Sequence, residues 1–379
     1  MISIGALKTM KDSNTGLWLC MAVAFLIPFD TIVFNNVSLV LWVGYGLLVS
    51  SKSIFKLDKT TWFIVLPVLL FSMNLFSLFS CGDIKCKSIS FSFLERHMLF
   101  AAFPLLYVAS PAYGKEDVKI ILEAFVWGNA MQIVIFLLPF FSLVHHPYLG
   151  MFSVFSFSYC LATYIQEKKM KHFLLSALLM ILIIVIKAKL AFGLACIITL
   201  VIFFRYGRLR LFYLSIILAA FGSSIIWFFF KSFIQNMFII KTYSWKCALE
   251  AYLGSQKYIF GVGIGDSEKM LLNVYQQYPD WIGYMGYNAH NQFIEIILAY
   301  GILGLIILTT WLLYGFIVSI RNENEWLYYF VIILFFSFQT ESMLWRQKGI
   351  LFTVFFFVVL LKEFEAESKS GYSEKSLGF

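Results

Sequence analysis

The sequence predicts an all-α protein that crosses a membrane many times. Of its 379 residues, 61% are hydrophobic and only 13% are charged, whereas about 25% of the residues of a typical soluble domain are charged. The apolar residues form about 12 runs, several of them shorter than the roughly 20 residues that a membrane-spanning helix needs. A soluble domain could not bury this much apolar surface, so we expect one transmembrane domain over residues 1–379 with about 12 transmembrane helices.

Short polar connections separate the apolar runs. The runs cover residues 16–34, 37–51, 60–80, 97–110, 118–143, 147–165, 173–186, 190–204, 211–230, 292–320, 327–344 and 349–361. One polar stretch is much longer than the others, residues 231–291. We expect it to form an outer loop that carries short helices, the first an amphipathic one over residues 231–250.

Lys and Arg residues predict the orientation, because cytoplasmic connections of membrane proteins carry an excess of positive charge. With the N-terminus in the cytoplasm, the short inner connections hold more than twice as many Lys and Arg residues as the short outer ones. We therefore expect both termini in the cytoplasm. The net charge of +8 then reflects orientation, and we expect no nucleic-acid partner.

Cys81 and Cys86 lie five residues apart in a polar connection that this orientation places outside. Disulfides persist in oxidising compartments. The sequence therefore allows a disulfide between these two cysteines but does not require one.

Several cations lie at the outer ends of the apolar runs, where the orientation does not call for them. A cation at this boundary is costly unless it reaches water or pairs with a partner. Snorkelling to lipid phosphates accounts for any single one, but their number at one face favours a shared anionic ligand. These cations are Arg96, Lys187, Lys189, Arg346 and Lys348, joined by others in the long loop.

The long loop re-enters the membrane at residues 288–304. Asn288 can cap the following helix, which would place His290 and Asn291 in its first turn. A helix N-terminus attracts phosphate and disfavours an imidazolium. We therefore expect His290 to be a neutral general base beside a phosphate. A capping histidine at the membrane interface is the alternative interpretation.

A glycine-rich stretch, Gly261-Val262-Gly263-Ile264-Gly265, lies within the same loop. Its spacing is similar to that of a dinucleotide-binding loop, but the flanking β-α-β pattern is missing. We expect these glycines to let the backbone pass close to another part of the molecule.

Four stretches in fixed order carry a family resemblance. They are Lys187-Ala188-Lys189 at a run boundary, Lys241-x-x-x-Trp245-Lys246 before Phe260-Gly261-Val262-Gly263-Ile264-Gly265, His290-Asn291-x-x-x-Glu295 before Tyr300-Gly301-x-x-Gly304, and Glu341-Ser342-Met343-Leu344-Trp345-Arg346-Gln347-Lys348-Gly349. In this order they resemble the motifs of the O-antigen ligase and polymerase family, whose members are bacterial membrane glycosyltransferases.

The resemblance implies a fold of the membrane glycosyltransferase C type (GT-C) in the bacterial inner membrane, with its site on the periplasmic side. The donor would be a glycan on undecaprenyl diphosphate, and the acceptor a sugar hydroxyl of the lipid A core of lipopolysaccharide. His290 would deprotonate the acceptor, and the transfer would invert the anomeric carbon. Positive side chains would hold the leaving diphosphate, so we expect no metal and no cofactor.

The substrate-binding residues that we predict are Lys189, Lys241, Arg96, Arg346, Asn291 and Lys246. The family usually has arginine at the positions of Lys189 and Lys241. Lysine neutralises a phosphate as a point charge but cannot make the planar two-pronged contact. We therefore expect Arg96 and Arg346 to share the work of binding the diphosphate.

Two alternative functions stay open. A polymerase of the same family, which joins polysaccharide repeat units, needs the same base and the same cations. A transporter of a lipid-linked anion would usually place its charges and its broken helices in the middle of the membrane, whereas the candidate charges here gather at one face.

Overall fold

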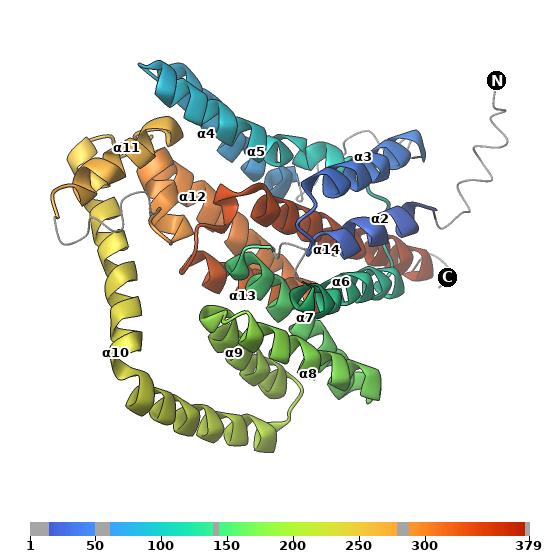
Figure 1. Ribbon diagram of the computed structural model, residues 1–379. Helices are drawn as coiled ribbons and strands as arrows, with labels where there is room; N and C mark the ends of the chain where they lie inside the picture. Colours follow the sequence, from blue (N-terminus) through green and yellow to red (C-terminus); the bar gives the residue numbers. More distant parts are fainter. Residues whose placement is uncertain (1–14, 50–60, 139–143, 279–287, 376–379) are drawn as a thin grey trace.

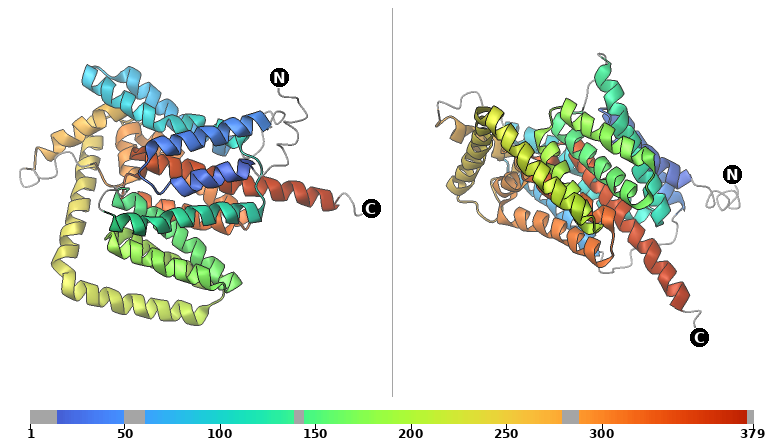
Figure 2. Two further views of the ribbon diagram at one scale, coloured as in Figure 1. Left: turned by 45° about the vertical axis from the view of Figure 1, so that its right-hand side comes forward. Right: turned by 90° about the horizontal axis from the view of Figure 1, so that it is seen from below.

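The computed structural model describes residues 15–49, 61–138, 144–278 and 288–375, without the side chains of residues 61–62, 217–238 and 364–375. The described residues are all-helical and contain no strand. The helices gather into one bundle (Figure 1). The start of α2 and the far end of α14 lie at one end of the bundle, and α11 lies at the other (Figures 1 and 2).

The element order matches the predicted runs closely. The elements are α2 (Thr15–Leu26), α3 (Ile32–Val49), α4 (Thr61–Ser80), α5 (Ile84–Ala109), α6 (Lys115–Leu137), α7 (His146–Glu167), α8 (Met170–Val185), α9 (Lys189–Arg205), α10 (Leu209–Ser255), α11 (Ile264–Tyr275), α12 (Gln292–Arg321), α13 (Glu325–Phe338), η2 (Met343–Trp345) and α14 (Gln347–Lys375). Each predicted run overlaps one main helix, although the run over residues 97–110 missed the start of α5 at Ile84 and the run over residues 327–344 extended beyond the end of α13 at Phe338. The first run was drawn too long, because α2 ends at Leu26, just before Pro28, which disfavours helix at the residue that precedes it.

The helices confirm a membrane-embedded helical protein. Among the described residues, six helices are long and apolar enough to cross a membrane: α3, α4, α5, α6, α7 and α12. Three more, α2, α8 and α13, are apolar but shorter, with 12, 16 and 14 residues. The figure of about 12 crossings remains a prediction.

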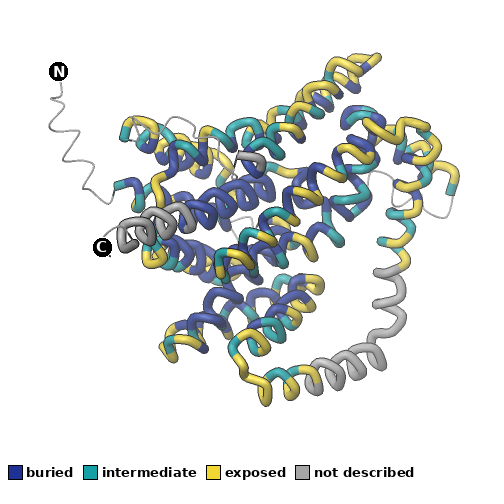
Figure 3. The backbone as a smooth tube through the Cα atoms, turned by 180° about the vertical axis from the view of Figure 1, so that it is seen from behind, coloured by how far each residue is buried: buried dark blue, intermediate teal, exposed yellow. Residues whose placement is uncertain are grey.

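Aromatic packing holds the centre of the bundle together, where α7 and α14 are buried along most of their described length (Figure 3). The ring of Phe352 on α14 lies 4.6 Å from that of Phe152 on α7, 5.3 Å from that of Phe330 on α13 and 5.6 Å from that of Phe125 on α6. Such tilted pairs contribute about 0.5–1.5 kcal/mol each beyond the burial of their area. They fix α7, α13 and α14, whose ends carry much of the site described below.

The long polar stretch over residues 231–291 is less independent than we expected. Its first part belongs to α10, which continues as one helix from Leu209 to Ser255. The helix predicted over residues 231–250 therefore exists, but as a continuation of the apolar helix before it. α10 passes from α9 at its start to α11 and α12 at its end (Figure 1). The aromatic residues 279–287 lie outside the described residues.

α12 is broken at Gly301, whose φ of 66° and ψ of −164° are not helical. Residues 258–263 run across the break and form hydrogen bonds with the backbone groups that the break leaves unpaired. Two N–H groups and two carbonyls that an unbroken helix would pair with each other bond instead to this crossing segment. The four bonds are Ile302 N to Tyr258 O at 2.9 Å, Leu303 N to Ile259 O at 3.2 Å, Val262 N to Leu298 O at 3.0 Å and Gly263 N to Ala299 O at 2.9 Å.

Glycines make this close crossing possible. Gly261 and Gly301 both have positive φ. A Cβ on Gly261 would lie 2.5 Å from the carbonyl oxygen of Ala299, and one on Gly301 would lie 2.3 Å from that of Ile259. The glycine-rich stretch therefore serves backbone contact, as the sequence predicted.

A disulfide closes the turn between α4 and α5. Cys81 and Cys86 are bonded to each other, and the side chain of Asp83 caps α5 by accepting a hydrogen bond from the N–H of Cys86 at 2.6 Å. The turn packs against the start of α11, where a Cβ on Gly265 would lie 2.6 Å from the carbonyl oxygen of Cys86. The disulfide thus lies at the α11 end of the bundle.

Replacing Gly301 with alanine tests the crossing. We expect the free energy of unfolding to fall by about 2 kcal/mol or more, because the left-handed backbone and the nearby carbonyl both oppose a Cβ. Gly44→Ala in α3 is the control, because its Cβ would meet nothing within 4 Å. Thermal unfolding of the purified proteins gives the comparison, and equal midpoints for both variants would show that the break does not depend on this glycine.

Candidate functional site

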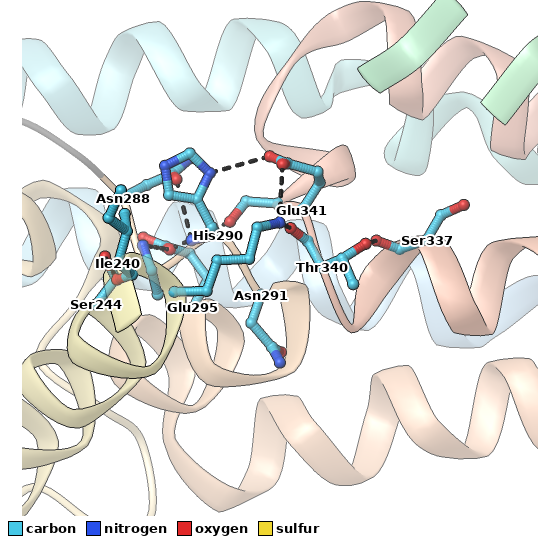
Figure 4. Close-up of polar contacts among 12 residues, drawn as sticks. Ile240, Ser244, Asn288, His290, Asn291, Glu295, Ser337, Thr340 and Glu341 are labelled. Carbon is cyan, nitrogen blue, oxygen red and sulfur yellow. Dashed lines mark hydrogen bonds and ion pairs between the residues drawn. The ribbon is translucent and has the colours of Figure 1, made fainter. Parts of the chain in front are cut away.

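Two polar segments meet at the α11 end of the bundle, and we call their junction the polar seam. It consists of residues 288–295, which lead into α12, and residues 339–344, which follow α13 (Figure 4). Four hydrogen bonds cross it. They run from Asn291 Nδ2 to Gln339 O at 2.9 Å, His290 Nδ1 to Glu341 Oε2 at 3.0 Å, Ser342 Oγ to Glu295 Oε2 at 3.3 Å and Leu344 N to Gln292 Oε1 at 2.6 Å.

Asn291 is the N-cap of α12. Its Oδ1 accepts hydrogen bonds from the N–H groups of Phe293 and Ile294 at 2.9 and 3.2 Å. The prediction that Asn288 caps this helix, with His290 and Asn291 in the first turn, is therefore wrong. The Oδ1 of Asn288 accepts instead from the N–H of His290 at 3.1 Å, and His290 takes a left-handed φ of 47° just before the cap.

Asn291 is only 4% exposed, and its side chain bonds at both ends, to the helix start and to Gln339. A side chain used in this way fixes the position of the helix. The structure therefore gives Asn291 a positioning role beside His290, although the sequence had predicted a substrate contact.

Glu341 bridges His290 and Lys241. Its Oε2 accepts from Nδ1 of His290 at 3.0 Å, and its Oε1 accepts from Nζ of Lys241 at 3.2 Å. Lys241 also donates to the carbonyl oxygen of Thr340. Because Nδ1 donates to the carboxylate, Nε2 is the nitrogen of the neutral imidazole that can take a proton.

The charge of Glu341 is maintained by its two partners. Burial raises the pKa of Glu341, but the hydrogen bond from His290 and the nearby charge of Lys241 outweigh it and hold the pKa below its usual value. Glu341 is therefore ionised at neutral pH. An ionised carboxylate both orients the imidazole and stabilises the imidazolium that forms when Nε2 takes a proton.

A groove of about 380 Å³ opens beside Glu341, and we call it the cationic groove. Its polar end is lined by Lys187, Lys189, Lys241, Glu341 and His146. Apolar side chains of α9 and α13 line the rest, among them Leu194, Ile197 and Phe336. Ile197 and Phe336 are 39% and 40% exposed, so the apolar part of the groove opens toward the surrounding lipid.

The structure thus brings together three of the predicted site residues. Lys189 and Lys241 line the cationic groove, and His290, which does not line it, bonds to the lining residue Glu341. The other predicted cations are not part of the groove lining.

Arg96, Arg346 and Lys246 do not line the cationic groove. The guanidinium of Arg96 lies 5.0 Å from the ring centroid of Phe93 on its own helix, and Arg346 is exposed. Lys246 pairs with Glu250 at 3.7 Å and lies 5.1 Å from the ring centroid of Tyr278. The arrangement therefore places lysines, not arginines, at the head of the groove.

Sequence reasoning missed two members of this site, Glu341 and His146. Glu341 is separated from His290 by 51 residues, so no local spacing links the two. Glu341 also fell inside the predicted apolar run over residues 327–344, whereas α13 ends at Phe338. His146 begins α7 ahead of Pro147, which marks the outer end of a helix.

Comparison with known proteins gives no relative: no model of a known protein family matches this chain, and no curated protein matches it. The geometry of the site therefore supplies the functional argument.

Glu341→Gln tests the ionised state of the bridge. A carboxylate whose pKa is depressed in the folded protein stabilises the fold above its unfolded pKa, and this contribution is lost as the pH falls through the folded value. We expect the variant to be less stable than wild type by about 1–2 kcal/mol at neutral pH. The difference should narrow only in acid solution, as the pH falls below the usual pKa of a glutamate side chain and through the lower pKa of Glu341 in the folded protein.

Thermal unfolding midpoints over a pH series make this measurement. Glu250→Gln is the control, because Glu250 pairs with Lys246 at 38% exposure and such pairs contribute little. A stability difference for Glu341→Gln that stays constant down to the most acid pH would show that the carboxylate is not ionised in the folded protein.

Proposed function

We propose that this protein is a glycosyltransferase of the bacterial inner membrane. It transfers a glycan from undecaprenyl diphosphate to a sugar hydroxyl of the lipid A core, as an O-antigen ligase does. The observation that carries the proposal is the bond of His290 to Glu341, a residue that lines a groove with lysines and apolar side chains in its wall. A prenyl diphosphate has the complementary form, an anionic head on a long hydrocarbon chain.

His290 serves as the general base in this proposal. The acceptor oxygen attacks the anomeric carbon, and its proton passes to Nε2 of His290 while Glu341 holds the proton on Nδ1. The bond between that carbon and the diphosphate oxygen breaks, and its electron pair leaves with undecaprenyl diphosphate. Attack from the side opposite the leaving group inverts the anomeric carbon.

The lysines neutralise the leaving group. Negative charge grows on the diphosphate as the bond breaks, and fixed positive groups that face this charge lower the barrier. Lys187, Lys189 and Lys241 line the same end of the groove. Lysine acts as a compact point charge and neutralises a phosphate, but it cannot make the planar contact to two phosphate oxygens that arginine makes.

The disulfide supports a periplasmic location for the site. Cys81–Cys86 lies at the α11 end of the bundle, where the N–H of Ile264 also bonds to Ser77 at 2.8 Å. Disulfides persist in the periplasm and are rare in the cytosol. The orientation predicted from the Lys and Arg residues places the same end outside and both termini in the cytoplasm.

The same base and the same lysines would serve a polymerase that joins repeat units. A strain without this protein separates the two functions, because loss of a ligase leaves the lipid A core bare whereas loss of a polymerase leaves it with a single repeat.

The broken helix is the feature that a transporter would share. A cavity of about 780 Å³ lies next to the break, between α4 and residues 256–263, and Lys257 is the one charged side chain among the described residues that line it. The freed backbone groups are already bonded to the crossing segment. The break therefore favours a structural role over the binding of a transported ion.

His290→Ala tests the base. With purified protein, lipid-linked donor and lipid A core acceptor, we expect the rate of transfer to fall by about 10²–10⁴. His172→Gln is the control, because His172 bonds Glu123 in another part of the bundle and glutamine keeps a polar group there. Transfer by His290→Ala at the wild-type rate would defeat the enzymatic assignment.

Substitution of the lysines tests their role, and Lys241 and Lys246 on α10 form a matched pair, one inside the groove and one outside it. We expect Lys189→Ala and Lys241→Ala to lower transfer by about 100-fold or more, whereas Lys246→Ala, on the same helix as Lys241 but outside the groove, should transfer at nearly the wild-type rate. All three variants should reach the membrane in normal amounts. Wild-type transfer by Lys189→Ala and Lys241→Ala would remove both residues from the site.

A further inference from the structure

A second groove of about 280 Å³ lies between α12 and α13, and we call it the apolar groove. Phe336 lines this groove and the cationic groove alike, so the two are neighbours. Thr309 is the one residue among the described lining that carries a polar side-chain atom. Leu313 and Phe335 are 54% and 43% exposed, so this groove too opens toward lipid.

The break in α12 shapes the apolar groove. Phe293 lies before the break and Thr309 after it, and in an unbroken helix they would be about 24 Å apart. Both nevertheless line the same groove. The ring of Phe293 lies 5.9 Å from that of Phe335 on α13. The first arm of α12 therefore covers the outer end of the groove, and the second arm forms its wall.

The covered end of the apolar groove lies next to the polar seam, on the segment that carries His290. The N–H of Phe293 bonds to the side chain of Asn291 at 2.9 Å, and Asn291 follows His290 directly. The cationic groove reaches the same polar seam from its other side through Glu341. The two lipid-facing grooves thus both reach the polar seam, one at Glu341 and the other at Phe293.

The charges of the two grooves differ. The cationic groove carries three lysines at its head, whereas the described residues that line the apolar groove include no charged side chain. A diphosphate head would therefore be held in the cationic groove, and the apolar groove offers contact to hydrocarbon alone.

We propose that the apolar groove binds an acyl chain of the lipid-anchored acceptor, so that donor and acceptor approach His290 from opposite sides of Phe336. This inference rests on the proposed function and identifies where the second lipid of that reaction is held. Because lipid tails are as apolar as the groove, binding there depends on close van der Waals packing, and filling the groove should weaken it.

Two adjacent threonines provide the test. Thr309 lines the apolar groove, whereas Thr310 is also exposed but does not line it. We expect Thr309→Trp to raise the KM for an acylated lipid A core acceptor about tenfold, with no change in the KM for the lipid-linked donor. The rate with a deacylated core oligosaccharide should also stay unchanged, and Thr310→Trp should match wild type with both acceptors.

The inference would be overturned if Thr309→Trp left the KM for the acylated acceptor unchanged. It would also be overturned if the variant impaired transfer to the deacylated acceptor as much as transfer to the acylated one. As a second measurement, a photoreactive acyl chain on the acceptor should crosslink wild-type protein in α12 and α13 near Leu313 and Phe335. Crosslinking there by a photoreactive prenyl donor instead would assign the groove to the donor. Absence of transfer from wild type to either acceptor would count against the proposed function, while the crosslinks would still test the groove.

Discussion

The structure depends on the hydrogen bonds that residues 258–263 supply to the broken α12. Within a membrane an unpaired backbone N–H or carbonyl costs several kcal/mol, so a helix can break there only if other groups replace the lost bonds. Here the crossing segment replaces them pairwise. The break lets the first arm of α12 turn over α13, and this turn places His290 opposite Glu341 and forms the apolar groove beneath Phe293.

The polar seam makes the resulting arrangement rigid. The hydrogen bonds that cross it join closely spaced residues on both sides. The carboxylate of Glu295, which is 2% exposed, accepts hydrogen bonds from the N–H of Ala289 at 2.7 Å and from the side chain of Ser342. In the proposed transfer, a base held in this way would need no reorganisation when the substrate arrives, and such preorganisation accounts for much of the rate enhancement of enzymes. The aromatic core fixes the helices on which both sides of the seam are mounted.

Sequence patterns predicted the depth of each part of the chain in the membrane but not the direction in which it faces. The apolar runs located the helices, and the positive charges at the ends of the runs drew attention to Lys189 and Lys241, which line one groove. Arg96 and Lys246 were predicted to bind substrate but do not line the groove, because the rotation of a helix within the bundle depends on packing that composition does not reveal. The pairing of His290 with Glu341 was missed for the same reason, since it joins two turns that only the fold brings together.

The cap of α12 was assigned to Asn288, whereas the structure has Asn291 as the cap. Both residue positions carry asparagine, a good capping residue, and the contact with Gln339 favours Asn291.

The central claim is that one imidazole and several lysines serve a single lipid diphosphate in the cationic groove. An experimentally determined structure with bound undecaprenyl diphosphate measures this most directly. The account predicts the two phosphates between Lys187, Lys189 and Lys241, with the prenyl chain along Leu194 and Phe336 and with Nε2 of His290 facing the free phosphate end. A diphosphate bound at Arg96 or Lys246, or in the cavity beside α4, away from His290, would contradict it.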